Sequence, residues 1–278
     1  MIKALVITVN YKNAQETIRF AGSISSVRSF DQVSVLLVDN ASADASFDAI
    51  TSAIEHMPNC RCLAAPKNLG YFGAAKWALD TWCTGAPIPD WVIVCNNDIL
   101  FPDPDFLTTL FAQSGDVGVI APRIVSMRND YEQNPFMTSR PGKVGLLKIR
   151  FWFSRFALCR LQTELSAPIR SITRALRSRA KSHLKRQPIY APHGAFIIFS
   201  RIYFERGGYI DDGAFLYGEE IGAAEAAARA GLSVIFEPSL KVVHNEHQST
   251  GNKLSRATFG YKRDALKYLR ERYWQDIG

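Results

Sequence analysis

The residues best suited to chemistry follow an apolar run near residue 95. Trp91 to Cys95 is typical of a strand buried on both faces, and Asn96, Asn97 and Asp98 come directly after it. In open α/β sheets, ligands bind at the carboxyl ends of the strands. Mg²⁺ and Mn²⁺ prefer oxygen ligands, usually one or two carboxylates completed by substrate phosphates. Asp98 is therefore a candidate ligand for Mg²⁺ or Mn²⁺, although a turn that only caps the strand would also explain the triplet.

A second set of reactive groups lies in the last quarter of the chain. Glu219 and Glu220 follow a glycine and open an alanine-rich helix predicted at 221–230. Two adjacent carboxylates can exchange protons with a substrate, but acidic residues in a first helical turn also stabilise the helix dipole. His244 ends a short apolar stretch, with His247 close behind. An imidazole beside carboxylates is a candidate metal ligand, whereas a histidine alone at this place would be structural.

Strands and helices alternate along the first hundred residues. Apolar runs predict strands at 4–9, 33–38, 61–64 and 91–95, and apolar spacing with capping residues predicts helices at 15–29, 46–57 and 74–82. Repeated βαβ units predict an α/β fold with a mostly parallel, Rossmann-like central sheet flanked by helices. Further along, strands are expected at 232–236, ended by Pro238, and at 241–243, and a closing helix at 255–277.

Polar residues follow most of the predicted strands. Because parallel strands share a carboxyl edge, this edge would collect Asn10, Asp39, Asn40, Asn68 and Asp98. Gly70 and Gly73 let the backbone approach a ligand at a helix N-terminus, a place that favours phosphate. Their spacing lacks the first glycine of the dinucleotide fingerprint, and the sequence holds no Walker motif. A tight turn without a ligand also explains these glycines.

Composition indicates a globular protein with one unusual segment. The 278 residues are 47% hydrophobic and carry a formal charge of +7. Residues 140–186 hold 13 Lys and Arg against one acidic residue, a balance of +12, so the other 20 basic and 25 acidic residues give −5. The five cysteines form no zinc-type pairs and indicate reduced thiols. Without a signal-peptide pattern or a run of ~18 apolar residues, we expect a cytoplasmic location and no transmembrane helix.

The basic segment, residues 140–187, has the composition of an interfacial helix. Bulky apolar residues alternate with Lys and Arg from Leu146 to Leu158, and Arg recurs every three or four residues from Ile169 to Leu184. Aromatic rings at the acyl boundary and cations on headgroups predict contact with an anionic membrane surface. A solvated basic helix that covers the core is the alternative. No nucleic-acid partner is expected, because the sequence shows no nucleic-acid-binding motif beside this basic segment.

Five motifs, in this order and at this spacing, resemble the family 2 glycosyltransferases, and in particular their bacterial rhamnosyltransferase-like branch. The motifs are residues 6–11, 37–44, 68–73, 96–98 and 216–220, within a similarity that covers 3–125 and 190–250. The resemblance implies the GT-A fold with a basic helical insert. It also implies four parts: a nucleotide-sugar-binding half at 1–139, the insert at 140–187, an acceptor and catalytic half at 188–254, and a C-terminal helix at 255–278.

The resemblance implies a role for each matching residue. Asp39 would read the base of the donor, with Thr8 and Asn10 beside it. The full set implied to bind the nucleotide sugar is Thr8, Asn10, Asp39, Asn40, Asn68, Gly70, Asn96 and Asn97. Asp98 matches the last Asp of the family's DxD motif, which holds Mg²⁺ or Mn²⁺ against the diphosphate. His244 matches a histidine that completes the metal shell in some relatives.

The resemblance also implies the reaction. Glu220 matches the general base that removes a proton from the acceptor hydroxyl, and Glu219 flanks it, where a second anion raises the pKa of the base. The implied reaction is inverting transfer of a sugar from dTDP-rhamnose or a UDP-sugar to a saccharide hydroxyl. The acceptor would be lipid-linked or part of a lipopolysaccharide or exopolysaccharide, met at the inner face of the plasma membrane.

Three departures from the family pattern keep other functions open. The 96–98 triplet has a single carboxylate, Glu220 stands where the family usually has Asp, and Gly222 and Ala226 replace a usual Asp and Arg. A non-catalytic, membrane-associated relative would explain these changes and the insert, but not the acidic residues at strand ends and turns. A nucleotidyltransferase would share the sheet and the metal, but residues 10–17 lack the Gly- and Arg-rich loop that it needs.

Overall fold

The computed structural model of the chain describes residues 1–128, 130–165, 184–246 and 255–275. The strands in these ranges are β1 (Ala4–Asn10), β2 (Val33–Asp39), β3 (Cys60–Ala64), β4 (Trp91–Asn96), β5 (Ile99–Leu100), β6 (Val119–Ser126), β7 (Gln187–Ile189), β8 (Phe196–Ser200) and β9 (Val234–His244). The helices are α1 (Ala14–Ser25), α2 (Ser46–Ala53), α3 (Tyr71–Cys83), α4 (Phe106–Phe111), α5 (Lys143–Trp152), α7 (Arg201–Glu205), α8 (Glu219–Arg229) and α9 (Arg256–Tyr273), with a 3₁₀ turn at Phe30–Gln32. Residues 156–165 are helical as well.

The described strands form one sheet with the order β3-β2-β1-β4-β8-β6-β9-β5, and β7 pairs with β9. Strands β1, β2, β3, β4, β6 and β9 run in one direction, and β5, β7 and β8 run against it. The α/β fold with a mostly parallel central sheet, predicted from the βαβ alternation, is confirmed. Since β8 is reversed, its first residues lie at the edge where the parallel strands end.

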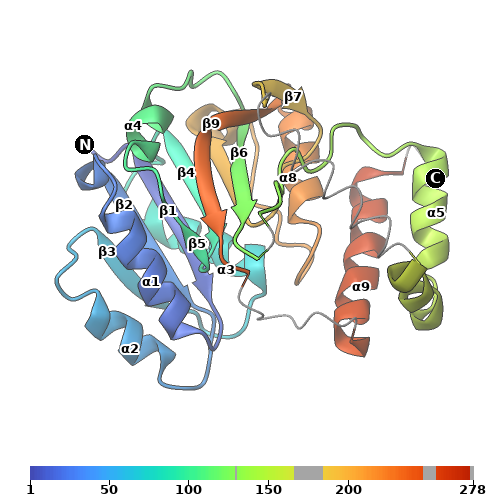
Figure 1. Cartoon of the computed structure of the whole chain (residues 1–278), viewed down its shortest axis with the longest axis horizontal. Helices are drawn as coiled ribbons and strands as arrows, with labels where there is room; N and C mark the ends of the chain where they lie inside the picture. Colours follow the sequence, from blue (N-terminus) through green and yellow to red (C-terminus); the bar gives the residue numbers. More distant parts are fainter. Residues whose placement is uncertain (129, 166–183, 247–254, 276–278) are drawn as a thin grey trace.

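Alternating side chains of β1 enter separate cores on the two faces of the sheet. Ala4 and Val6 join the core that α1, α2 and α4 cover. Leu5 and Ile7 join the core that α3, α7 and α8 cover. Figure 1 shows these two layers of helices around the sheet. Because β1 is packed from both sides, the polar residue at its end has a fixed position.

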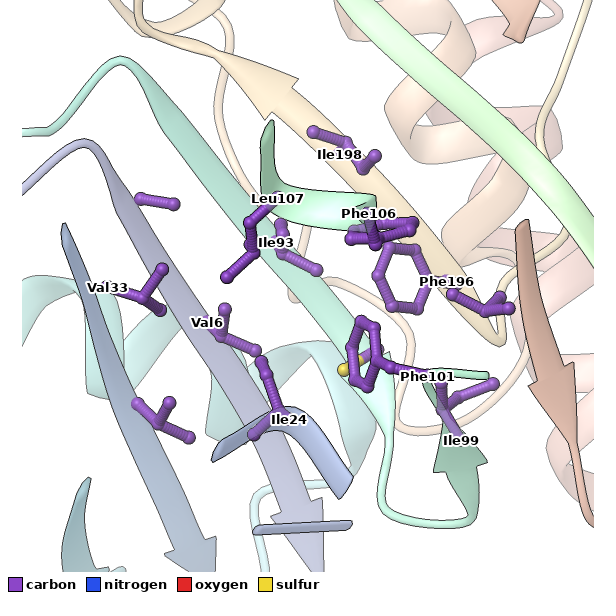
Figure 2. Packing of buried hydrophobic residues seen from close by; sticks show 14 of the residues in the cluster. Val6, Ile24, Val33, Ile93, Ile99, Phe101, Phe106, Leu107, Phe196 and Ile198 are labelled. Carbon is purple, nitrogen blue, oxygen red and sulfur yellow. The ribbon is translucent and has the colours of Figure 1, made fainter. Parts of the chain in front are cut away.

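An aromatic cluster fills the first core beneath β4 and β5. The rings of Phe101, Phe106 and Phe196 meet edge to face, with centroids 5.1 to 5.9 Å apart (Figure 2). Edge-to-face pairs add ~0.5–1.5 kcal/mol each beyond the area that they bury. Phe101 follows the candidate metal ligand Asp98 by three residues, and the cluster therefore anchors the loop that carries this ligand.

The end of the sheet differs from the sequence-based expectation. The sequence predicts that Pro238 ends a strand, but β9 continues through it to His244. The register shifts between Pro122 and Arg123 of the facing strand β6, and residues 238–240 form a bulge. A proline is tolerated at a bulge because no ladder hydrogen bond is lost there. One long strand therefore carries His244 directly to the carboxyl edge.

The insert and the C-terminal helix add a layer outside α8. Figure 1 shows α9 between α8 and α5, and the apolar cluster that joins them contains Leu269, Tyr273 and Trp274 of the C-terminal segment, Leu146 of α5 and Ile221 of α8. Arg140 pairs with Glu225 of α8 at 2.7 Å. No helix in the described ranges is long and apolar enough to cross a membrane. The predicted basic stretch from Ile169 onward lies, up to residue 183, outside the described residues.

Candidate active site

The carboxyl ends of three neighbouring strands form the first part of the site. Asn10 at the end of β1 pairs in register with Asp39 at the end of β2. On the other side of β1, Val9 pairs with Asn96 at the end of β4. The sheet itself therefore brings together three residues that lie far apart in the sequence. This juxtaposition follows from parallel pairing alone, as the sequence predicted.

A network of hydrogen bonds holds the Asp39 carboxylate in one orientation. Asn10 Nδ2 donates to Asp39 Oδ1 at 2.8 Å, and the backbone N–H of Ser42 donates to Oδ2 at 3.2 Å. The Ser42 hydroxyl also donates to Oδ1. Ala41 and Ala43, on both sides of Ser42, have left-handed φ angles of 55° and 54°. Such a backbone costs free energy for residues with a Cβ, so the loop keeps a strained shape that aims Ser42 at the carboxylate.

The glycine-bearing turn is held by two asparagines. Asn40 Nδ2 donates to Asn68 Oδ1 and to the Gly70 carbonyl, each at 3.0 Å, and the Leu69 N–H donates to Asn40 Oδ1 at 2.8 Å. Gly70 has φ of +78°, and a Cβ at this position would lie 1.9 Å from the Phe215 carbonyl oxygen. Only glycine fits there. The structure therefore places Asn40 and Asn68 inside the framework that shapes the turn.

The other amide side chains near the ends of β1 and β4 also form hydrogen bonds within the protein. Asn97 Nδ2 donates to Thr17 Oγ1 at 2.9 Å, and the Thr17 hydroxyl donates to Asn10 Oδ1 at 3.1 Å. Thr8 and Asn10 are both fully buried. Asn10, Thr17 and Asn97 tie β1, α1 and the turn after β4 to one another, whereas the Thr8 hydroxyl is buried without a hydrogen-bond partner in the described structure.

A carboxylate and an imidazole face each other where β4 and β9 end. Asp98 Oδ1 lies 3.1 Å from His244 Nε2. Gln133 donates its amide N–H to Glu246 at 2.6 Å, so its oxygen is the atom 2.9 Å from His244 Nδ1. His244 therefore carries a proton on Nδ1, and in the neutral ring the lone pair of Nε2 points toward Asp98. The amide of Asn96 lies 3.4 Å from the same nitrogen.

This arrangement fits a divalent cation. Asp98 Oδ1 is buried, and while His244 is neutral it has no hydrogen-bond donor among the described residues, because its contact with Nε2 then joins two acceptors. Two neighbouring ligands of an octahedral ion, each ~2.1 Å from it, lie about 3.0 Å apart, close to the separation seen here. No three His, Cys, Asp or Glu side chains gather into a metal site within the described ranges. Asp98 and His244 would hold an ion together with substrate oxygens.

A strained turn presents the two glutamates. Tyr217 and Gly218 have φ of +70° and +95°, and α8 begins immediately afterwards at Glu219. The turn therefore places both glutamates in the first turn of the helix. A Cβ on Gly194, at the start of β8, would lie 2.9 Å from Glu220 Oε1. Gly194 thus leaves the space that the Glu220 carboxylate occupies.

The two carboxylates differ in basicity. Burial, and then the charge of Glu220, raises the pKa of Glu219 to about 8. Burial also raises the pKa of Glu220, but backbone N–H groups, including those of Gly194 and Gly218, and the Lys262 ammonium oppose this effect. Oε2 of Glu219 is buried without a hydrogen-bond partner in the described structure. The N–H groups and the ammonium around Glu220 favour the anion on that residue, which makes Glu220 the candidate base.

Tyr71, which the sequence analysis did not single out, connects the two halves of the site. Its hydroxyl donates to the Gly194 carbonyl at 3.2 Å, and its backbone N–H donates to the Phe215 carbonyl at 3.1 Å. The ionisable groups that act on the phenol are Cys95, Glu219, Asp98 and Glu220. Burial first, and then these groups, raises the pKa of Tyr71 well above its usual value. The phenol is therefore within electrostatic reach of both the candidate metal ligand and the candidate base.

His193 is a second residue that sequence reasoning missed. It lies just before β8, and its ring centroid is 6.3 Å from that of His244. The Ala195 N–H donates to His193 Nδ1 at 3.1 Å. Burial, and then the neighbouring His244, lowers the pKa of His193 to about 4. The sequence shows a histidine and a glycine before an apolar strand, but the reversed direction of β8, which brings both to the carboxyl edge, could not be predicted.

A comparison with protein families identifies the family of the chain. The sequence profile of glycosyl transferase family 2 matches residues 5–206, which is most of the chain. The chain belongs to glycosyl transferase family 2. The match includes Asp39, the Gly70 turn and Asp98, whereas the two glutamates and His244 lie beyond it. No match was found among curated proteins.

Solved structures of low sequence identity share the fold of this family 2 chain. A mannosyltransferase, PcManGT from Pyrobaculum calidifontis in complex with GDP-Man and Mn²⁺, has a TM-score of 0.53 at 16% identity, over 96% of this chain and 69% of the other. GalNAc-T7 with UDP, GalNAc and Mn²⁺ has a TM-score of 0.62 at 14% identity, over 100% of this chain and 50% of the other. A mycobacterial protein has a TM-score of 0.55 at 14% identity, over 98% and 75%. These likenesses establish the GT-A fold.

Proposed function

We propose that this family 2 protein is an inverting, divalent-metal-dependent glycosyltransferase that moves a sugar from a nucleotide-diphosphate sugar to a saccharide hydroxyl. The observation that carries the proposal is that two carboxylates of this site, on Asp98 and Glu219, each keep a buried oxygen without a hydrogen-bond partner among the described residues. Asp98 Oδ1 lacks a donor beside a lone pair of His244, and Glu219 Oε2 lacks a partner beside Glu220. A cation would satisfy the Asp98 oxygen, and a proton shared by the glutamates satisfies the Glu219 oxygen.

Proton removal by Glu220 is the first part of the proposed reaction. Its carboxylate takes the proton of the acceptor hydroxyl, whose oxygen forms a bond to the anomeric carbon. The bond from that carbon to the diphosphate breaks, and the nucleoside diphosphate leaves with the electron pair. Attack from the face opposite the leaving group inverts the configuration. Glu219 keeps its own proton and so leaves Glu220 as the single anion of the pair.

The donor is placed by groups on the other half of the edge. Asp39 is fixed as a hydrogen-bond acceptor, which suits an N–H of a pyrimidine base. A divalent ion held by Asp98 and His244 would supply positive charge against the departing diphosphate. In this proposal residues 1–139 contribute Asp39 and Asp98, and residues 188–254 contribute His244 and the base. dTDP-rhamnose and UDP-sugars are the donors that we would test first.

We also propose that residues 140–187 place the enzyme on an anionic membrane, at the cytoplasmic face where a lipid-linked acceptor would be met. Large apolar side chains in this segment are exposed, and those in its helices are Val144, Leu147, Phe151, Leu161 and Leu165. A basic segment that exposes apolar residues is typical of interfacial helices.

A donor screen tests the transferase. Purified protein is mixed with UDP-, dTDP- or GDP-sugars, with Mn²⁺, Mg²⁺ or a chelator, and thermal shift and release of the nucleotide are measured. We expect one nucleotide class to stabilise the protein only with metal, and Glu220→Gln to bind this donor without turning it over. The anomeric configuration of the product then tests inversion. Lack of stabilisation by every donor, with metal making no difference, would favour a non-catalytic relative.

A further inference from the structure

The side of α9 that faces away from the active site lines a groove. The groove runs between α5 and α9 and has a volume of about 420 Å³, within the ~300–1,000 Å³ of typical small-molecule pockets. Its apolar lining consists of Leu146, Leu147, Ile149, Phe153, Leu266 and Trp274. In Figure 1 both helices stand outside the sheet and its flanking helices, so the groove is separate from the carboxyl edge.

Positive charge surrounds this apolar lining. The basic residues of the groove are Lys143, Arg150, Arg263, Lys267 and Arg270, and no acidic residue lines it. All five are exposed. In the described part of the chain only Arg263 has an acidic partner among them, Asp264 at 2.9 Å. Apolar walls bordered by uncompensated cations are complementary to an amphiphile with an anionic head.

The surface beside the groove favours a lipid over an acidic peptide. Val144, Leu147 and Phe151 of α5 are 66%, 61% and 57% exposed, and their spacing puts them on one side of the helix. Leu161 and Leu165 are also exposed on the next helix. A peptide in the groove would leave this apolar stripe in water, whereas a bilayer would cover the stripe and supply the ligand.

We propose that the α5–α9 groove binds one anionic phospholipid, with its phosphate against the cationic border and an acyl chain along the apolar lining. This inference rests on the membrane placement proposed above and names its binding site and ligand. The opposite side of α9 abuts the catalytic turn. Leu269 packs against Gly218, and Lys262 lies over the Tyr217 ring at 4.9 Å. A bound lipid therefore fixes the helix that supports the turn before Glu219.

Flotation of the full chain with vesicles tests the charged border. The wild-type protein should float with phosphatidylcholine vesicles that contain phosphatidylglycerol, and not with phosphatidylcholine alone. Lys267→Glu should lower vesicle binding about tenfold, because it replaces a cation at the proposed phosphate position with an anion. The matched control is Lys148→Glu, the same charge change at an exposed α5 residue that does not line the groove. An equal loss in both variants would mean diffuse attraction and overturn the site.

The apolar lining is tested without a change of charge. Leu266→Trp fills the groove, and Leu147→Gln changes an exposed lining residue whose replacement does not endanger the fold. Both should weaken flotation several-fold while circular dichroism stays that of the wild type. Wild-type flotation of either folded variant would contradict the proposal.

Two further measurements separate the possible outcomes. Soluble glycerol phosphate should not compete with vesicles, because it lacks the chain that the groove would hold; full competition would indicate a phosphate site instead. Binding of an acidic amphipathic peptide in place of either vesicle would identify a protein partner and overturn the proposal of a lipid ligand.

Two control variants separate lipid binding from catalysis. Glu220→Gln should float as the wild type does, and Lys267→Glu should keep the wild-type rate with a soluble acceptor. Failure of lipid binding is therefore distinguishable from failure of the transferase.

Discussion

The Asp39 cluster and the pair of carboxylates at Asp98 and Glu219 belong to one candidate site but differ in how their polar groups are satisfied. Both oxygens of Asp39 accept hydrogen bonds within the protein. Asp98 and Glu219 each keep a buried oxygen without a donor in the described structure. A buried polar group left without a partner costs ~1–3 kcal/mol. The folded protein therefore carries this free-energy cost at Asp98 and Glu219, and avoids it at the Asp39 carboxylate.

This difference separates groups that shape a site from groups that act in it. Both oxygens of the Asp39 carboxylate have partners before any ligand arrives, so this cluster contributes to folding stability, and in the proposed function it presents a fixed acceptor to the nucleotide sugar. In the proposed function, the buried oxygens of Asp98 and Glu219 gain their partners from an ion, a proton or a substrate. Substitutions should therefore lower stability in the first region and activity or ligand binding in the second.

The largest effect is expected at the base. Glu220→Gln keeps the size of the side chain but cannot take a proton, and it should lower kcat about 10³-fold, within the ~10²–10⁴ that general bases contribute. Donor binding should stay unchanged, because the contacts of Asp39 and Asp98 are intact. Steady-state rates and donor titrations measure the two quantities. Glu219→Gln is the matched control and should retain most of the activity. A similar loss of activity in both variants would contradict the assignment of Glu220 alone as the base.

Removal of the candidate metal ligand should have the next largest effect. Asp98→Ala leaves His244 as the remaining side-chain ligand and should weaken metal-dependent donor binding about a hundredfold, or ~2.7 kcal/mol. Its free energy of unfolding without metal should not fall, because a buried carboxylate without a donor disappears. Calorimetric titration of donor with and without Mn²⁺ measures the loss. Donor binding that is unchanged with metal would remove Asp98 from the metal site.

The opposite signature is expected for Asn10. Asn10→Ala leaves Asp39 without its amide donor and removes one of the two acceptors of the Thr17 hydroxyl, both in buried surroundings, so the free energy of unfolding should fall by ~2 kcal/mol. Urea denaturation measures this change, and Asp98→Ala is the comparison. Equal destabilisation by the two substitutions would show that the two regions do not differ in the way described.

Much of the edge could be predicted because it follows from parallel pairing. Asn10, Asp39 and Asn96 end apolar runs, and parallel strands bring such ends to the same edge of the sheet whatever their order. The roles of Asn40 and Asn68 could not be predicted in the same way. Each is polar and follows a strand, which is the pattern of a ligand contact and also the pattern of a turn clamp. Only the bonds between them decide that they shape the turn.

The partners on the far half of the sheet depend on strand direction and long-range pairing. His193 reaches the edge because β8 is reversed, and His244 reaches it because β9 continues through Pro238. Neither direction nor a bulge has a local signature strong enough to be read from this chain. Tyr71 belongs to the glycine turn in the sequence, yet its hydroxyl contacts a carbonyl 123 residues away. Contacts of this range are set by tertiary packing.

The smallest effect expected concerns the dependence of stability on pH. The pKa of Glu219 rises from 4.5 to about 8 on folding, so between these values the folded chain keeps a proton that the unfolded chain releases. The folded state binds more protons, and its stability therefore falls as pH rises through this window. Glu219→Gln should remove that slope and raise the stability at about pH 8. Urea midpoints across this window measure it, with Glu55→Gln in the exposed turn after α2 as the control. A slope that survives in Glu219→Gln would assign the retained proton to another group, and the two glutamates would then both be free to act as anions.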